Sequence, residues 1–203
     1  MLDAGCGSGL LLPCVADRLR VGGHYLGMDI LPAGLAAVEE KARRLGVAQV
    51  VSTQQADLSR PLPVEDGAID CAAAHFSVYT LSEEADRRHA WQELYRVVKP
   101  GGCLIAANPT SDYDASQIIH GSIESLGGRV SSAKLWILKY GVYPLTLRLG
   151  LKHIQRQIQK GKWHGYTLKE FCGEIEIAGF SIEHTESVYA GSGILIVARK
   201  PFL

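Results

Sequence analysis

The chain has 203 residues, of which 47% are hydrophobic and 21% charged, and its formal net charge at pH 7 is +0. This length fits one domain with a sizeable core, and the composition excludes a repetitive or low-complexity chain. The overall neutrality by itself identifies no partner. The sequence contains no run of 18 uncharged apolar residues, so we expect no membrane-spanning helix.

The cysteines indicate a reducing compartment. Their number is odd, and they show neither a CxxC motif nor the Cys/His spacing of a metal site. No basic leader precedes an apolar stretch, so we expect no signal peptide and a cytoplasmic location. The five cysteines are Cys6, Cys14, Cys71, Cys103 and Cys172.

The first nine residues predict the end of a buried strand, a tight glycine turn and a helix that starts near Leu10. Gly5, Gly7 and Gly9 let the backbone turn sharply and approach a ligand without a Cβ in the way. The N–H groups at the start of the following helix give the turn a positive end.

Strands and helices then alternate as far as residue 107. We expect helices over 10–20, 32–45 and 81–98, strands over 24–30, 47–53, 69–75 and 103–107, and a turn at 99–102. This alternation predicts a doubly wound α/β fold with a mostly parallel sheet, whose ligands bind at the carboxyl ends of the strands. Asp29, Asp57 and His75 follow or end strands and are therefore expected at that edge.

Residues 108–165 interrupt the alternation, and we interpret them as an insertion within one domain, 1–203. Thr167 and Glu170 form a capping-box pattern that opens the next helix. The last two strands, 180–186 and 193–199, are joined by too short a segment for a crossover helix, so we expect them to pair antiparallel.

Several motifs together resemble the class I S-adenosylmethionine-dependent methyltransferases, over nearly the whole chain. They are Leu-Asp-Ala-Gly-Cys-Gly-Ser-Gly at 2–9, Gly-Met-Asp at 27–29, Ala-Asp-Leu at 56–58, Ile-Asp-Cys at 69–71 and Arg-Val-Val-Lys-Pro-Gly-Gly at 96–102. The resemblance implies a seven-stranded sheet in the order 3-2-1-4-5-7-6 with strand 7 antiparallel. Family members usually carry helices before the first strand, which this sequence is expected to lack.

The resemblance also implies a site for S-adenosylmethionine, with S-adenosylhomocysteine as product and no metal. Asp29 can accept hydrogen bonds from the ribose hydroxyls. Asp57 and the Leu58 N–H are expected at the adenine, and Asp3 with the glycine turn at the methionine part. The expected cofactor-binding residues are Asp3, Gly5, Cys6, Gly7, Gly9, Asp29, Ile30, Asp57, Leu58, His75 and Phe76.

Methyl transfer needs mainly alignment and the exclusion of water, and it needs a base only if the acceptor is protonated. His75 is the candidate catalytic base, although the matching position in the family often only lines the cofactor pocket, with Phe76 covering the cofactor. Weaker candidates are Tyr79, His120, His164 and Tyr166.

Residues 125–169 contain nine basic residues and no acidic one, together with many aromatic residues and an apolar centre, 135–151. We expect this stretch to cover the cofactor as a lid and to bind a small acceptor that is hydrophobic or partly anionic. A peripheral contact with an anionic membrane is the second interpretation, and nucleic acid the third. Ala74-His75-Phe76-Ser77 stands where base-methylating families place Asn/Asp-Pro-Pro-aromatic, which argues against nucleic acid.

Two alternatives to a small-molecule methyltransferase remain open. An NAD-dependent oxidoreductase would have glycine at position 10, where this chain has Leu10. A non-catalytic protein that binds S-adenosylmethionine, or a scaffold remnant, is suggested by the short first strand. The oligomeric state does not follow from the sequence.

Overall fold

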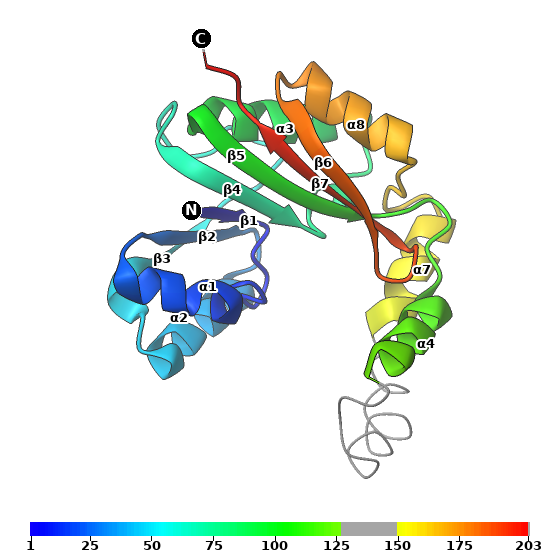
Figure 1. Cartoon of the computed structure of the whole chain (residues 1–203), viewed down its shortest axis with the longest axis horizontal. Helices are drawn as coiled ribbons and strands as arrows, with labels where there is room; N and C mark the ends of the chain where they lie inside the picture. Colours follow the sequence, from blue (N-terminus) through cyan, green and yellow to red (C-terminus); the bar gives the residue numbers. More distant parts are fainter. Residues whose placement is uncertain (127–149, 203) are drawn as a thin grey trace.

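The computed structural model describes residues 1–126 and 150–202, with a seven-stranded sheet in the order β3-β2-β1-β4-β5-β7-β6 (Figure 1). Only β7 runs antiparallel, to both β5 and β6, so the predicted order and direction are confirmed. The strands are β1 (Leu2–Ala4), β2 (Tyr25–Asp29), β3 (Val51–Gln55), β4 (Ile69–His75), β5 (Val98–Pro109), β6 (Ser181–Val188) and β7 (Gly193–Arg199).

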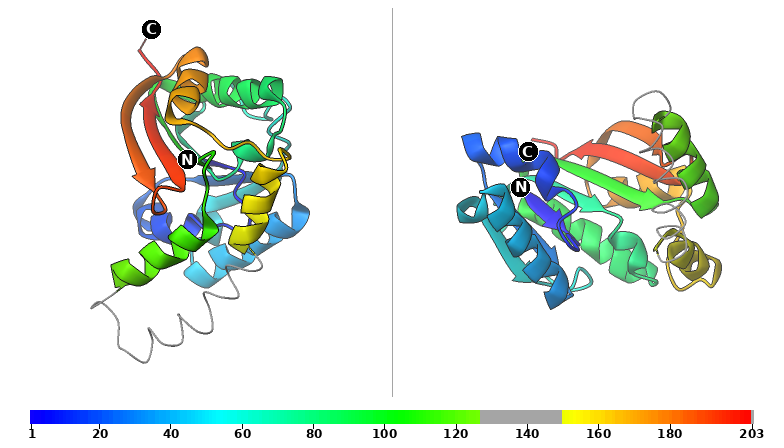
Figure 2. Two further views of the ribbon diagram at one scale, coloured as in Figure 1. Left: turned by 90° about the vertical axis from the view of Figure 1, so that its right-hand side faces the viewer. Right: turned by 90° about the horizontal axis from the view of Figure 1, so that it is seen from below.

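Helices cover both faces of this sheet (Figures 1 and 2). The helices α1 and α2 pack on the β1–β3 end of one face, and α3 and α8 pack on the opposite face of β4, β5 and β7. The described helices are α1 (Leu12–Val21), α2 (Pro32–Leu45), α3 (Glu84–Val97), α4 (Ala115–Leu126), α7 (Lys152–Gln159) and α8 (Leu168–Ile177), with short 3-10 turns at Ala48–Val50 and Val78–Thr80.

The core under α3 and α8 contains large apolar side chains and one buried polar network. Trp91 and Leu94 of α3 and Phe171 of α8 are fully buried, and each contributes about 1.5–3 kcal/mol through the burial of apolar surface. Within this core, Glu174 accepts hydrogen bonds from Trp91 Nε1 at 2.9 Å and Tyr166 Oη at 2.8 Å. It also pairs with the buried Arg87 guanidinium at 3.3 Å, which ties α3 to α8.

The structure differs from the sequence prediction at several element boundaries. The first helix begins at Leu12, and the helix predicted over 81–98 begins at Glu84. Residues 99–102, predicted as a turn before the strand, are part of β5 and form an irregularity in its pairing with β4 between Ile69 and Cys71. A Cβ at Gly102 would lie 2.8 Å from the Asp70 carbonyl oxygen of β4, so this close approach of the two strands requires glycine.

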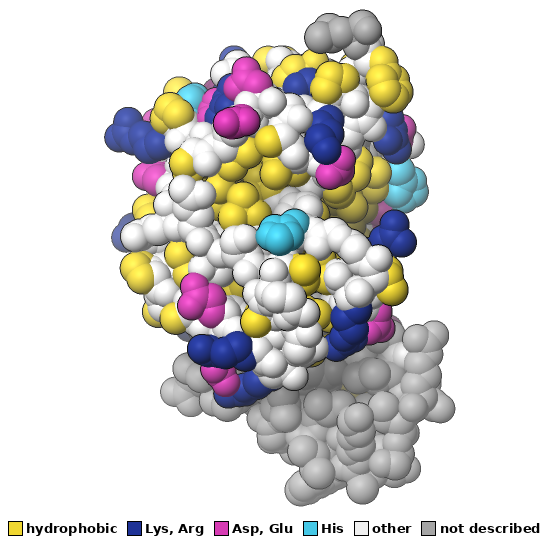
Figure 3. Space-filling view, turned by 90° about the vertical axis from the view of Figure 1, so that its left-hand side faces the viewer, with side chains coloured by type: hydrophobic (Ala, Val, Ile, Leu, Met, Phe, Trp, Pro, Cys, Tyr) yellow, Lys and Arg dark blue, Asp and Glu magenta, His cyan; other side chains and the backbone are white. Residues whose placement is uncertain are grey.

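The basic and acidic side chains are interspersed on the face shown in Figure 3, with hydrophobic side chains between them. In the part of the chain that the structure describes, no helix has the length and apolar character needed to cross a membrane. The aromatic residues Trp136, Tyr140 and Tyr143 of the predicted lid, with most of its apolar centre, lie outside the described residues.

Candidate functional site

The glycine turn after β1 is held against the end of β2 by backbone hydrogen bonds. The N–H groups of Gly5 and Cys6 both donate to the Met28 carbonyl oxygen at 2.8 Å. Gly5 has a φ of +77°, and a Cβ at this position would lie 2.2 Å from Ser77 Cβ. Only glycine fits both this conformation and this close approach, so the turn requires glycine at position 5.

Asp29, at the end of β2, lies directly beside this turn. Its Oδ2 accepts a hydrogen bond from the Gly7 N–H at 2.8 Å, and its Oδ1 accepts one from the Leu31 N–H at 2.9 Å. Each carboxylate oxygen can accept a further hydrogen bond. The carboxylate is therefore oriented by the backbone and keeps acceptor capacity for a ligand.

A cavity of about 350 Å³ extends from the turn toward Asp57. Asp57 Oδ1 accepts hydrogen bonds from the Ser59 N–H at 2.9 Å and from Ser59 Oγ at 2.8 Å, whereas Oδ2 has no protein donor among the described residues. Ser77 Oγ is buried and, within the same described ranges, also lacks a partner. The cavity is lined by Gly5, Gly7, Asp29, Ile30, Leu31, Ala56, Asp57, Leu58, Phe76, Ser77, Thr80 and Leu81. Much of its wall is apolar, and we name it the polar cavity after the carboxylates of Asp29 and Asp57.

A second cavity, of about 400 Å³, lies on the other side of the turn, and its wall is mostly apolar. We name it the apolar cavity. It is lined by Asp3, Gly5, Cys6, Gly7, Ser8, Leu10, Leu11, His75, Phe76, Tyr113, Ile118, Leu151, Ile154 and Tyr189.

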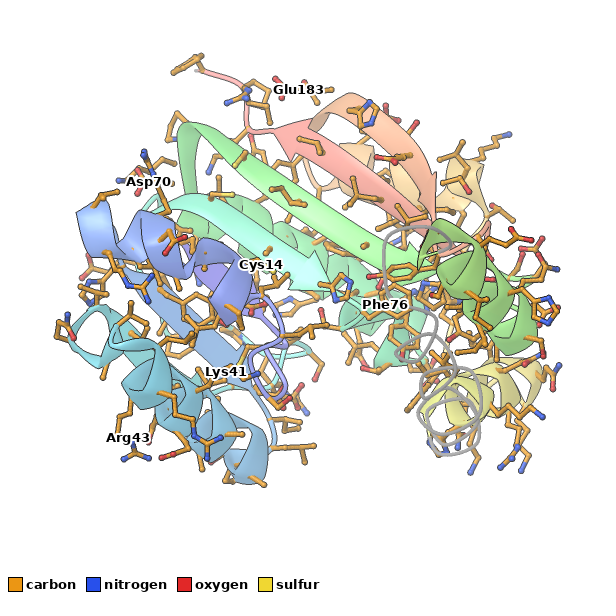
Figure 4. The ribbon with its side chains drawn as sticks, turned by 60° about the horizontal axis from the view of Figure 1, so that its bottom comes forward. Cys14, Lys41, Arg43, Asp70, Phe76 and Glu183 are labelled. Carbon is orange, nitrogen blue, oxygen red and sulfur yellow. The ribbon has the colours of Figure 1, made fainter. Side chains whose placement is uncertain are left out.

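Gly5, Gly7 and Phe76 line both cavities, so the two cavities meet at the glycine turn. Phe76 follows β4 with a φ of 51°, which is uncommon for a residue with a side chain. In Figure 4 its ring lies at the carboxyl end of β4 beside α4 and α7, whereas Asp70 lies at the opposite end of this strand. The site thus occupies the carboxyl edge of the sheet, as predicted.

Asp3 and Cys6 form the buried floor of the apolar cavity. Burial raises the pKa of Asp3 to about 6, an effect that the hydrogen bond from the Tyr25 hydroxyl opposes and the nearby charge of Asp29 increases. Burial also raises the pKa of the Cys6 thiol to about 12, with a further contribution from the two carboxylates. Cys6 therefore remains a neutral thiol near pH 7.

His75, at the end of β4, brings an imidazole into the same cavity. Its Nε2 lies 2.7 Å from Tyr189 Oη, and burial lowers the pKa of the imidazole. Tyr113 also lines the cavity, is 4% exposed, and has a hydroxyl with no hydrogen-bond partner among residues 1–126 and 150–202. These three side chains place polar groups in an otherwise apolar wall.

Gly9 and the four weaker catalytic candidates do not line either cavity. Gly9 supports the turn from behind, since a Cβ there would lie 3.0 Å from Val38. Tyr79 packs edge-on against Phe76, and His120 is exposed on α4. His164 lies 2.8 Å from Glu170, and Tyr166 belongs to the buried Glu174 network.

Three further residues that line the cavities, Ser77, Tyr113 and Tyr189, were not predicted from the sequence. Tyr189 lies in the short connection between β6 and β7, which we interpreted only as a turn, and Tyr113 lies at the start of the predicted insertion. Aromatic residues in such connections carry no periodic signal. Only the topology, which places β7 next to β5, indicates that Tyr189 can reach the end of β4.

The described part of the basic stretch packs over the apolar cavity. Ile154 and Ile158 of α7 lie against Tyr113 and Ile118, while Lys152 and Arg156 are exposed on the other side of α7. Because its apolar side chains contact the protein, α7 is not an amphipathic helix with a free apolar face.

Comparisons of the sequence and the fold with known proteins identify the family of this chain. Residues 2–106 match the family described as a methyltransferase domain. The chain is 31% identical over 121 residues to a sterol 4-C-methyltransferase of Caenorhabditis elegans, a match that covers 59% of this chain and 34% of that protein. It is also 31% identical over 105 residues to a ubiquinone/menaquinone biosynthesis C-methyltransferase of Pectobacterium carotovorum, covering 52% of this chain and 40% of the relative. The chain thus spans well under half the length of these relatives.

Among solved structures, a SAM-dependent methyltransferase from Methanosarcina mazei has a TM-score of 0.67 at 19% identity, with 100% of this chain and 92% of that chain covered. At this identity the likeness establishes the fold alone, and the family match carries the assignment. The chain therefore belongs to the S-adenosylmethionine-dependent methyltransferases of the class I, Rossmann-like fold.

Proposed function

We propose that this chain transfers the methyl group of S-adenosylmethionine to a small, largely apolar acceptor. The observation that carries this proposal is the junction of two chemically different cavities at Gly5, Gly7 and Phe76. One cavity ends in carboxylates, and the other has an apolar wall. A donor that extends through the junction would present its reactive end to whatever the apolar cavity holds.

The polar cavity fits the adenosine part of this donor. Asp29 would accept hydrogen bonds from the ribose hydroxyls, and Asp57 Oδ2 from the adenine amino group, with Ile30 and the Leu58 backbone beside the ring. Among the described residues that line this cavity there is no Lys or Arg to bind a phosphate group. When bound, the donor supplies an activated methyl group on a positively charged sulfur.

The floor of the apolar cavity fits the methionine part. Asp3, Gly5, Cys6 and Gly7 line it beside the turn, and the buried Asp3 carboxyl would be held in its charged form by a ligand ammonium group. His75 lines the same cavity, where we assign it the role of general base for an acceptor that carries a proton.

The acceptor part of the cavity is formed by the segment that we assign as the lid, within residues 108–165. Tyr113, Ile118, Leu151 and Ile154 supply apolar wall area, and exposed basic residues on α7 supply a positive rim. This combination suits a hydrophobic molecule with or without an acidic group. Because α7 uses its apolar side for this wall, a small-molecule acceptor is favoured over a membrane surface or nucleic acid.

The proposal is tested by incubating the protein with radiolabelled S-adenosylmethionine and fractionated cell extract. We expect label in the solvent-soluble small-molecule fraction. Label in protein or nucleic acid would contradict the acceptor class, and S-adenosylhomocysteine binding without any label transfer would support the non-catalytic alternative.

The oxidoreductase alternative is tested by comparing thermal shifts with S-adenosylhomocysteine and with NAD. We expect stabilisation by S-adenosylhomocysteine only, since the antiparallel β7 is foreign to the dinucleotide-binding sheet order 3-2-1-4-5-6. A comparable shift with NAD would contradict our assignment.

A further inference from the structure

We propose that Tyr113 and Tyr189 bind an ionisable hydroxyl group of the acceptor, and that Tyr189 passes the proton of this hydroxyl to His75. The acceptor class that this arrangement selects is a phenol or an enol. The inference rests on the proposed function, because it concerns the acceptor part of the same site.

The first observation is the contact between His75 and Tyr189. His75 Nε2 and Tyr189 Oη are 2.7 Å apart, at a normal hydrogen-bond distance, and both side chains line the apolar cavity. Burial lowers the pKa of His75, so the imidazole is neutral near pH 7 and can accept a proton. With the ring proton on Nδ1, Nε2 accepts the hydrogen bond that the Tyr189 hydroxyl donates.

The second observation is that the surrounding structure holds Tyr189 in this position. Tyr189 and Ala190 have φ angles of 55° and 53°, a left-handed backbone that residues with side chains rarely adopt. Gly193 leaves room for the ring, since a Cβ there would lie 2.9 Å from Tyr189 Cδ2. The ring of Phe76 packs edge-on against Tyr189 at a centroid distance of 5.2 Å.

The third observation is the unpartnered hydroxyl of Tyr113. This side chain is 4% exposed and lines the apolar cavity, and its Oη has no hydrogen-bond partner in the described part of the chain. Burial raises its pKa to about 12, so it remains a donor. A buried hydroxyl without a partner is costly, and an acceptor oxygen in the cavity would supply the missing partner.

Few charged groups lie around this pair within residues 1–126 and 150–202. Asp3 on β1 is the one carboxyl among the residues that line the apolar cavity, and Cys6 is a neutral thiol. No Lys or Arg is among these lining residues, so no described cation of the wall would stabilise a phenolate directly. We assign the stabilisation of the negative charge on the acceptor oxygen to the Tyr113 hydroxyl and to the protonated imidazole.

The proton balance of the step is complete without another reactant. The O–H bond of the acceptor breaks, and its proton moves to Tyr189 Oη. At the same time the Tyr189 O–H bond breaks, and that proton forms a new bond to His75 Nε2. The acceptor becomes a phenolate or enolate, the imidazole becomes an imidazolium, and no electron is transferred. The anion is the nucleophile that the proposed methyl transfer needs, and solvent removes the proton from His75 afterwards.

The test uses 4-nitrophenol as the probe, because its anion absorbs visible light and its ionisation can be read without any methyl transfer. At a pH below the probe's own pKa, we expect the wild-type protein to raise the acid dissociation constant of bound 4-nitrophenol by about tenfold. Tyr189→Phe and His75→Asn should still bind the probe but should leave it protonated. Tyr113→Phe should weaken its binding by about fivefold, the loss of one hydrogen bond.

Tyr95→Phe is the control, because Tyr95 lies on α3 against Phe180, outside both cavities. We expect this variant to ionise the probe as the wild type does. Ionisation that persists in Tyr189→Phe would overturn the relay, and a wild-type protein that leaves the bound probe protonated would do the same. Calorimetry with S-adenosylhomocysteine separates the two proposals. Wild-type binding of this ligand together with failed probe ionisation rejects only the relay, whereas absent binding rejects the proposed function.

Discussion

The Gly7 N–H donates a hydrogen bond to Asp29 Oδ2 at 2.8 Å, across 22 residues of sequence. This bond joins the two features that the sequence analysis singled out first, the glycine turn and the acid at the end of β2. Asp29 therefore has two roles, because it shapes the turn and also presents its remaining acceptor capacity to the polar cavity.

Replacing Asp29 by alanine should weaken S-adenosylhomocysteine binding by more than about tenfold, since hydrogen bonds to a charged group contribute about 1.5–3 kcal/mol each. Isothermal titration calorimetry measures this loss. Asp17→Ala is the matched control, because the Asp17 side chain is 98% exposed on α1. Equal affinities for the two variants would show that Asp29 does not contact the ligand.

Gly5→Ala and Gly7→Ala should differ strongly in stability. At Gly5 a Cβ would lie 2.2 Å from Ser77 Cβ and the φ of +77° is also unfavourable, so we expect a loss of about 2–5 kcal/mol. At Gly7 a Cβ meets nothing within 4 Å, and the φ of +50° alone should cost about 1–2 kcal/mol. Urea denaturation without ligand measures both, and equal losses would contradict the close packing of Gly5 on Ser77.

The contribution of Asp3 to the stability of the ligand-free protein should fall as the pH rises from about 4 to about 6. Burial raises the pKa of Asp3 from 3.8 to about 6, so in this range the native state keeps a proton that the unfolded state releases. The stabilisation is complete below the unfolded pKa and is lost as the pH rises through the folded one, to a total of about 3 kcal/mol. Asp3→Asn should lack this component in denaturation measured against pH, and identical pH profiles would contradict it.

Glu174→Ala should destabilise the protein by about 3–5 kcal/mol, because it leaves the buried Arg87 guanidinium without its counter-charge. Glu176→Ala on the same helix is the matched control, and its exposed side chain should change stability by less than about 0.5 kcal/mol. Chemical denaturation measures both variants. Similar effects would mean that the Glu174 network does not stabilise the contact between α3 and α8.

The alternation of elements predicted a mostly parallel sheet with an antiparallel ending and placed the carboxylates at strand ends, whereas the full strand order was implied only by the resemblance to the methyltransferase family. Hydrophobic runs in the sequence show where the strands of a doubly wound sheet end, and local steric rules show where glycine permits a tight turn. Asp29 and Asp57 come directly after such runs, so topology alone places them at one edge. Thr167 likewise accepts a hydrogen bond from the Glu170 N–H at 3.2 Å, as its capping pattern predicts.

The acceptor side of the site could not be predicted in the same way. Tyr113 and Tyr189 are 76 positions apart in sequence, and they line the same cavity in a sheet where β7 lies between β5 and β6. The weaker catalytic candidates Tyr79 and Tyr166 line neither cavity, since the ring of Tyr79 packs against Phe76 and Tyr166 belongs to a buried network. The residue type alone does not distinguish a tyrosine that lines a cavity from one that packs in the core, because the difference depends on long-range contacts.

In the part of the chain that the structure describes, Phe76 lies with Gly5 and Gly7 where two separate compartments of the binding space meet. An adenosine-like fragment and an apolar aromatic fragment should therefore bind at the same time without competing. A linker that joins the two fragments past Phe76 would make the binding of the second fragment intramolecular, with an effective concentration of about millimolar. The arrangement thus suits a two-part inhibitor whose selectivity comes from the acceptor end.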